Sequence, residues 1–128
     1  MENEKLSRPT DSELEILSIL WEKKNASVRE VHEELSKTKE SGYTTTLKLM
    51  QIMFEKGFVT RDDSKKTHIY FPQITRESTR KQFVGKIINN LFSGSPAALA
   101  LQALGHASLS RKELDDIQEM IDQLKANQ

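Results

Sequence analysis

The fold of this chain is decided by residues 42–59, GYTTTLKLMQIMFEKGFV. Three threonines in this segment precede a set of apolar side chains at helical spacing: Leu47, Met50, Met53 and Phe54. Lys56 and Gly57 then supply a last-turn cation and a residue suited to the left-handed position after a helix. The pattern predicts a helix over residues 44–56 whose first turn is polar.

Two capping boxes lie upstream of this helix. Residues 10–13 (TDSE) and 27–30 (SVRE) each place a hydroxyl three residues before a glutamate, so that the two side chains satisfy free N–H groups of a first helical turn. The first box predicts a helix over residues 11–24, and the second predicts a short helix that ends near Leu35. Each has an apolar face, formed by Leu14, Ile16, Leu17, Leu20 and Trp21 in the first helix and by Val28, Val31 and Leu35 in the second.

After Gly57 the apolar spacing changes from the helical period towards alternation. The segment 58–61 (FVTR), a polar turn over 62–66 and the segment 67–71 (THIYF) together indicate a β-hairpin that ends before Pro72. Three helices followed by a hairpin predict a winged helix-turn-helix domain over residues 1–74. The expected fold class is mostly α, with the hairpin as a small β wing.

The remaining residues, 75–128, have helical patterns over 75–92, from Pro96 onward, and after a third capping box at 110–113 (SRKE). A tail this short rarely supplies enough core alone, so we expect a helical dimerisation domain, although an intramolecular core is the alternative. The expected dimer contacts are Phe83, Ile87, Ile88, Leu91, Leu101, Leu104, Ile117 and Ile121.

Composition excludes several classes of protein. The chain has 128 residues, 19 basic and 19 acidic side chains, and no cysteine, which rules out disulfides, thiol catalysis and cysteine-ligated metals. No apolar stretch approaches the length of a membrane span, so we expect a cytoplasmic protein with no membrane partner. Charge is uneven along the chain, because residues 37–66 hold 7 basic and 4 acidic side chains, whereas residues 1–36 hold 5 and 9.

The helix pattern points to double-stranded DNA. The second helix of a helix-turn-helix motif lies in the major groove, with its N-terminal residues facing the bases. We therefore expect base contacts from Thr44, Thr45 and Thr46, with Lys48 and Gln51 further along the helix, and phosphate contacts from Arg29, Arg61, Lys65 and Lys66. The threonines could instead serve only as a first helical turn, and the wing cations as an ordinary solvated tip.

No catalytic pattern is present in the sequence. His32, His68 and His106 are too widely spaced to suggest a metal site, and the chain contains no phosphate-binding loop and no nucleophile motif. We expect neither an enzyme nor a bound cofactor or metal.

Several short motifs, in their order and spacing, resemble the penicillinase repressor family of the BlaI/MecI type, to which the copper-transport repressors are related. They are Pro9-Thr10, Glu13, Ile16-Leu17, Leu20-Trp21, ASVREV at 26–31, YTTT at 43–46, Leu47, Met50 and KGFV at 56–59. The resemblance implies a homodimeric repressor that binds an inverted-repeat operator of TACA/TGTA type. It also implies base reading by Thr44, Thr45 and Thr46 and wing contacts from Arg61, Lys65 and Lys66.

The chain departs from this family at three places. Thr46 stands where the family usually has valine, which adds a hydroxyl to the proposed reading helix. The Asn-Phe pair cleaved by a regulatory protease in the β-lactam-responsive members is replaced by Gln102-Ala103, which argues against release by cleavage. The cysteine cluster of the related copper-responsive repressors is missing. A winged-helix protein-interaction module without DNA binding is the alternative function.

Overall fold

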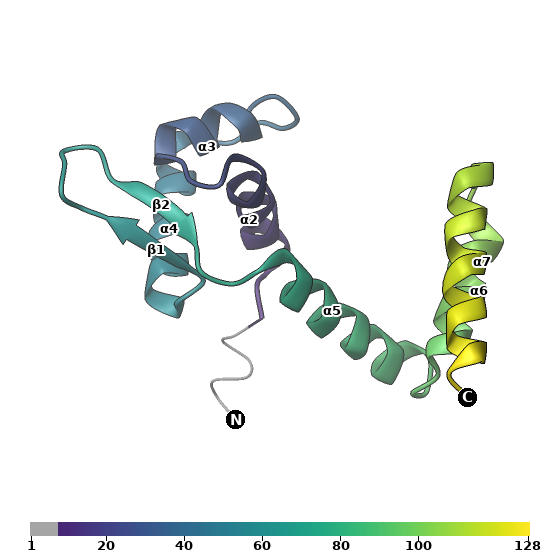
Figure 1. Cartoon of the computed structure of the whole chain (residues 1–128). Coiled ribbons are helices and arrows are strands. Elements are labelled where there is room, and N and C mark those ends of the chain that lie inside the picture. Colours follow the sequence, from purple (N-terminus) through teal and green to yellow (C-terminus); the bar gives the residue numbers. More distant parts are fainter. Residues whose placement is uncertain (1–7) are drawn as a thin grey trace. The chain divides into compact units, whose positions relative to one another are not determined.

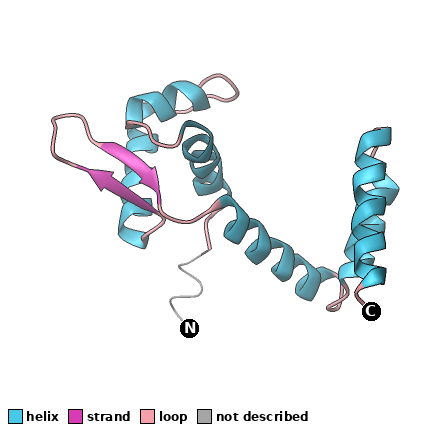
Figure 2. Ribbon diagram, in the orientation of Figure 1, coloured by secondary structure: helices cyan, strands magenta, loops and turns pink. Residues whose placement is uncertain are grey.

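The computed structural model describes residues 8–128, which form six helices and one two-stranded sheet (Figures 1 and 2). The elements are α2 (Asp11–Lys23), α3 (Val28–Leu35), α4 (Tyr43–Lys56), β1 (Val59–Asp62), β2 (Ile69–Pro72), α5 (Arg76–Leu91), α6 (Pro96–His106) and α7 (Arg111–Ala126). The predicted fold class, mostly helical with a small hairpin, is confirmed. The predicted helix ends differ by a residue or two, as at Lys24, whose positive φ of 78° ends α2 one residue early.

All three predicted capping boxes are present. At the start of α2, the backbone N–H of Glu13 donates to Thr10 Oγ1 at 3.2 Å, and the backbone N–H of Thr10 donates to Glu13 Oε1 at 2.8 Å. Ser27 and Ser110 make the same reciprocal pairs at the starts of α3 and α7. The predicted helix starts are therefore set by local hydrogen bonds that the sequence encodes directly.

The first three helices and the hairpin form a winged helix. β1 and β2 are antiparallel, with Val59 opposite Pro72 and Asp62 opposite Ile69. Two further backbone hydrogen bonds, 2.8 and 3.1 Å long, join Tyr70 of β2 to Ala26 between α2 and α3. The hairpin is therefore fastened to the helices as well as to itself, and Figure 2 shows it beside them.

One hydrophobic core holds this part of the chain together. Its buried side chains come from all three helices and from the hairpin: Ile16, Leu17, Leu20, Ala26, Val28, Val31, Leu35, Met50, Met53, Phe58, Val59 and Tyr70. Glu13 is also buried, at 1% exposure, and its carboxylate lies 2.9 Å from Lys56 Nζ. This ion pair ties the start of α2 to the end of α4, where Gly57 takes the left-handed conformation with φ of 86°.

Contacts divide the chain into two compact units, Met1–Val84 and Gly85–Gln128. The division falls inside α5, C-terminal to the boundary predicted between residues 74 and 75. The first turns of α5 belong to the first unit, in which Thr79 is buried and Trp21 Nε1 donates to the Ile74 carbonyl at 2.9 Å. In the second unit no residue is buried, and leucines as exposed as Leu91 (75%) and Leu101 (71%) face solvent.

None of the helices in residues 8–128 has both the length and the apolar character required to cross a membrane.

Candidate nucleic-acid interface

The polar first turn of α4 presents two of its three threonines to solvent. Thr44 and Thr45 are exposed, but Thr46 has no exposed surface and its hydroxyl donates to the Gly42 carbonyl at 3.4 Å. Thr46 shares its face of the helix with Met50 and Met53, at the spacing of one and two turns. The expectation that Thr46 contacts bases is therefore wrong for its side chain, because a fully buried hydroxyl cannot reach a base edge.

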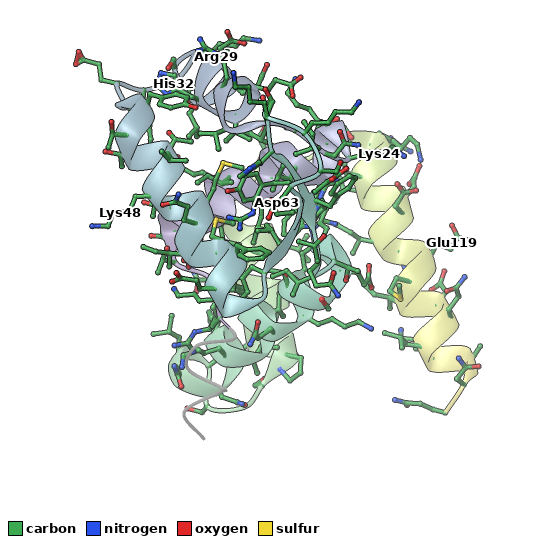
Figure 3. All side chains as sticks on the ribbon, turned by 90° about the vertical axis from the view of Figure 1, so that its left-hand side faces the viewer. Lys24, Arg29, His32, Lys48, Asp63 and Glu119 are labelled. Carbon is green, nitrogen blue, oxygen red and sulfur yellow. The ribbon has the colours of Figure 1, made fainter. Side chains whose placement is uncertain are left out.

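Further along α4, Lys48 and Gln51 are both exposed. The Lys48 side chain extends away from the helix into solvent (Figure 3). Gln51 lies about two turns after Tyr43, and both line the groove described next. The helix thus offers hydroxyl, ammonium and amide groups along its accessible side, which are the groups used on base edges and phosphates.

A groove of about 530 Å³ lies between the start of α3, the helix α4 and the hairpin. It brings together four of the predicted site residues, Arg29, Gln51, Arg61 and Lys66, from three separate elements. The other four exposed predictions, Thr44, Thr45, Lys48 and Lys65, do not line it. The structure therefore brings four of the predicted residues together in one groove, and the other four lie outside it.

Tyr43, at the first position of α4, organises the α3 side of this groove and was not predicted. The Arg29 guanidinium lies 5.9 Å from the centre of the Tyr43 ring, and the His32 ring meets it edge-on at 5.7 Å. His32 Nδ1 is buried and has no hydrogen-bond partner among residues 8–128. An aromatic residue directly before the threonines was the available signal, since a first-turn side chain of α4 is close to the start of α3.

Arg61 is held within the protein. Its guanidinium stacks on Phe54 of α4 at 4.1 Å from the ring centre, and Nε donates to the Asp63 carboxylate at 2.7 Å. Only 21% of its side chain is exposed. The Tyr70 hydroxyl and the Asp63 carboxylate both raise the pKa of the Arg61 guanidinium. Arg61 therefore connects the hairpin to α4, in contrast to its expected role as a free wing cation.

The tip of the wing is ordered by its own acidic residue. The backbone N–H of Ser64 donates to Asp62 Oδ1 at 2.9 Å, and this bond lowers the pKa of the Asp62 carboxyl. Lys65 and Lys66 follow this turn, are exposed, and form no ion pair within the described part of the chain. His68, on the groove side, lies 3.6 Å from Asp63. The wing thus presents two lysines that are available to an anion.

The residues predicted for dimer contact fall in both units. Phe83 lies in the first unit and is half-buried, whereas the other seven lie in the second. Four of these seven are exposed: Ile87, Leu91, Leu101 and Ile121. The other three, Ile88, Leu104 and Ile117, are partly exposed. The second unit therefore carries apolar side chains that its own fold does not cover.

Within residues 8–128, no group of three histidine, aspartate or glutamate side chains is arranged to hold a metal ion.

Comparison with known proteins gives consistent matches over nearly the whole chain. A family model described as penicillinase repressor matches residues 9–123. The penicillinase repressor of Staphylococcus aureus is 23% identical over 113 residues, covering 88% of this chain and 90% of that protein. The transcriptional regulator BlaI of Mycobacterium tuberculosis is 26% identical over 125 residues, covering 95% and 88%.

A solved structure also aligns with part of the chain. It is the solution structure of the DNA binding domain of the repressor BlaI, with a TM-score of 0.49 and 26% identity over 53% of this chain and 83% of that one.

Proposed function

Because the chain belongs to the penicillinase repressor family, we propose that it is a sequence-specific DNA-binding transcriptional repressor and not an enzyme. The observation that carries this proposal is the groove of the first unit in which the start of α3, the helix α4 and the wing meet. This is the arrangement in which a helix-turn-helix protein sets one helix into the major groove while flanking elements hold the backbone. The protein would act in the cytoplasm, where it would bind the DNA.

The exposed residues divide into two roles. Thr44, Thr45 and Gln51 would contact bases, since hydroxyls can meet any base edge and an amide suits adenine. Arg29, Lys48, Lys65 and Lys66 would contact phosphates, which supply affinity without sequence information. Arg61 would act indirectly, because its stacking on Phe54 and its pair with Asp63 hold the wing against α4.

The protein would bind DNA as a homodimer. The uncovered apolar residues of α5, α6 and α7 supply a surface for a second copy, and a two-fold protein matches an inverted-repeat operator. Doubling the site also doubles the number of phosphate contacts.

Release from DNA would not follow the cleavage route of the β-lactam-responsive members. The pair Gln102-Ala103 replaces the cleaved Asn-Phe pair and lies inside α6, where the backbone is hydrogen-bonded in a helix. A regulatory protease that recognises the family's pair would therefore have no substrate bond here, and another signal is required.

The test is selection of bound fragments from genomic DNA by the full-length protein, followed by titration of the selected sequence against salt. We expect an inverted repeat with half-sites one helical turn, or a multiple of it, apart. We also expect affinity to fall steeply as salt rises, because phosphate contacts release counterions.

Two variants separate the roles. Replacing both Lys65 and Lys66 by alanine should weaken binding to all sequences and flatten the salt slope by roughly 2. Thr45→Ala should leave the slope unchanged and reduce discrimination against a mutated operator about tenfold. The matched control changes two exposed lysines of α7, Lys112 and Lys125, to alanine. Equal losses from both variants on every sequence would contradict this division of roles.

The net charge of zero favours one alternative, a winged-helix module that binds another protein. Absence of any enriched DNA sequence, together with weak binding that does not depend on salt, would support this module over the repressor.

A further inference from the structure

A second groove lies within the first unit, between α2 and the first turns of α5. Its volume is about 390 Å³, within the range of pockets that hold small molecules. Leu14 and Trp21 of α2 and Phe83 of α5 supply an apolar lining, and all three are half-buried. This groove is distinct from the one beside α4, because the two share no lining residue.

The apolar lining is held in place before any ligand arrives. Trp21 Nε1 donates to the Ile74 carbonyl at 2.9 Å, which fixes the indole between α2 and the segment that leads into α5. Since the indole N–H is already satisfied, the ring offers its remaining surface as an apolar contact. A ligand that packs on it needs little rearrangement of the protein.

The charged part of the lining is entirely cationic. Arg76 and Arg80, one turn apart on α5, both line the groove, and no acidic residue does. Arg76 lies 5.7 Å from the Trp21 ring centre and pairs at 3.4 Å with Glu22, whose side chain is 80% exposed. Such an exposed pair is weak and exchanges readily. Arg80 makes no side-chain hydrogen bond or ion pair in residues 8–128.

We propose that this groove binds a small carboxylate that carries an aromatic ring. The guanidinium groups of Arg76 and Arg80 would hold the carboxylate, for which their planar forks are well suited. The ring would lie against Trp21 and Phe83, and the exposed Ser18 hydroxyl can donate to the ligand. The inference goes beyond DNA binding, because it concerns a different surface of the same unit.

The position of the groove gives such a ligand a route to regulation. Arg76, Thr79, Arg80 and Phe83 all belong to α5, which continues past Val84 into the second unit. A ligand that ties α5 to α2 therefore acts on the helix that connects the two units. This would supply a signal in a chain that lacks both the cleaved pair of the β-lactam-responsive members and the cysteine cluster of the related copper-responsive repressors.

Trp21 makes the proposal directly testable, because it is the single tryptophan of the chain. The full-length protein is titrated with phenylacetate at constant ionic strength, and indole emission is followed. We expect a saturable change with a Kd of about millimolar, as is ordinary for a fragment of this size. Phenylacetamide, which has the same shape without the charge, should bind at least about tenfold more weakly.

A pair of variants on one helix assigns the response to the groove. Arg80→Gln should raise the Kd for phenylacetate about tenfold with the thermal unfolding midpoint unchanged, because Arg80 is exposed. Its matched control is Lys81→Gln, at the neighbouring position of α5 and outside the lining, which should leave the Kd unchanged.

Three outcomes would overturn the proposal. They are linear, non-saturable quenching by phenylacetate, an equal response to phenylacetamide, and an Arg80→Gln protein that binds like the wild type.

Discussion

The two units of this chain differ in whether they complete their own cores. In Met1–Val84, side chains from three helices and a hairpin meet in one cluster of twelve buried hydrophobic residues. In Gly85–Gln128, helices of similar length contain no buried residue. The contrast teaches that helix formation and core formation are separate problems, since α7 has good caps and an apolar face but nothing in its own unit to bury that face.

The apolar residues of α7 recur along one side of the helix, at Leu114, Ile117, Ile121 and Leu124. A helix with such an apolar face is stable in water only when another surface covers that face. The first unit therefore covers its own apolar residues, whereas the second leaves its apolar residues exposed, as the proposed dimerisation requires.

The largest effect is expected when a core side chain is truncated to alanine. Leu20→Ala removes a fully buried side chain and should lower the free energy of unfolding by about 2–5 kcal/mol. Leu124→Ala, at 58% exposure, should cost less than about 0.5 kcal/mol in dilute protein. Urea denaturation of both variants measures the two changes in the free energy of unfolding. Equal losses of stability would show that the two units do not differ in how they bury their side chains.

The next test breaks the proposed assembly. Replacing Leu101 and Ile121 by glutamate places two charges on the uncovered apolar surface and should weaken self-association by roughly 100-fold. Sedimentation equilibrium gives the association constant. A control with Gln102 and Gln118 changed to glutamate carries the same added charge. If that control dissociates as fully as the test variant, the added charge explains the dissociation, and the apolar surface is not what joins the copies.

A smaller effect comes from two capping boxes with the same chemistry in different surroundings. Glu13→Gln keeps an oxygen for the cap but loses the ion pair with Lys56, and should lower stability by about 1–2 kcal/mol. Glu113→Gln, in the exposed box of α7, should leave thermal unfolding almost unchanged. Thermal scans give the unfolding midpoint of each variant. A larger loss of stability from Glu113→Gln than from Glu13→Gln would show that burial of the glutamate does not govern the difference.

The smallest effect is a pH dependence at α7. Hydrogen bonds from the backbone N–H and hydroxyl of Ser110 lower the pKa of the Glu113 carboxyl. A lowered pKa in the folded state means that this carboxylate stabilises the helix start at pH values above its unfolded pKa. The contribution is lost as pH falls through the folded pKa. Carbon NMR of the side chain should show a midpoint below the ordinary glutamate value, and a midpoint above it would contradict the cap.

Most of the fold could be predicted because its signals are local. Each capping box lies within four residues, and the change of apolar spacing after Gly57 marks the hairpin without knowledge of any distant contact. Membership of the fold class followed from the order of these elements alone.

Of the two errors in the candidate site, one was avoidable from the sequence and the other was not. The burial of Thr46 could have been found, since Thr46, Met50 and Met53 share one helical face. The stacking of Arg61 on Phe54 could not, because strand and helix positions become neighbours only once the hairpin folds back on α4. Glu13 carried a clear cap signal, but its partner Lys56 is 43 residues away.

The groove between α2 and α5 could not be predicted from the sequence, because it depends on contacts between residues far apart in the chain. It depends on the path from β2 into α5, which the hydrogen bond from Trp21 to Ile74 fixes across 53 residues. Arg76 and Arg80 are ordinary surface residues in the sequence, and only their placement beside the indole distinguishes them.

The pairing of Ala26 with Tyr70 also bears on how fast the first unit can fold. Its two hydrogen bonds join segments that are far apart in sequence, so they form only after most of the first unit has been brought together. Helices α6 and α7 depend on near-neighbour hydrogen bonds, and such helices form within about a microsecond. We therefore expect the strand pairing to be the slow step in folding of the first unit. Helices α6 and α7 can form faster, but a helix with an uncovered apolar face is marginal in water until another surface covers that face.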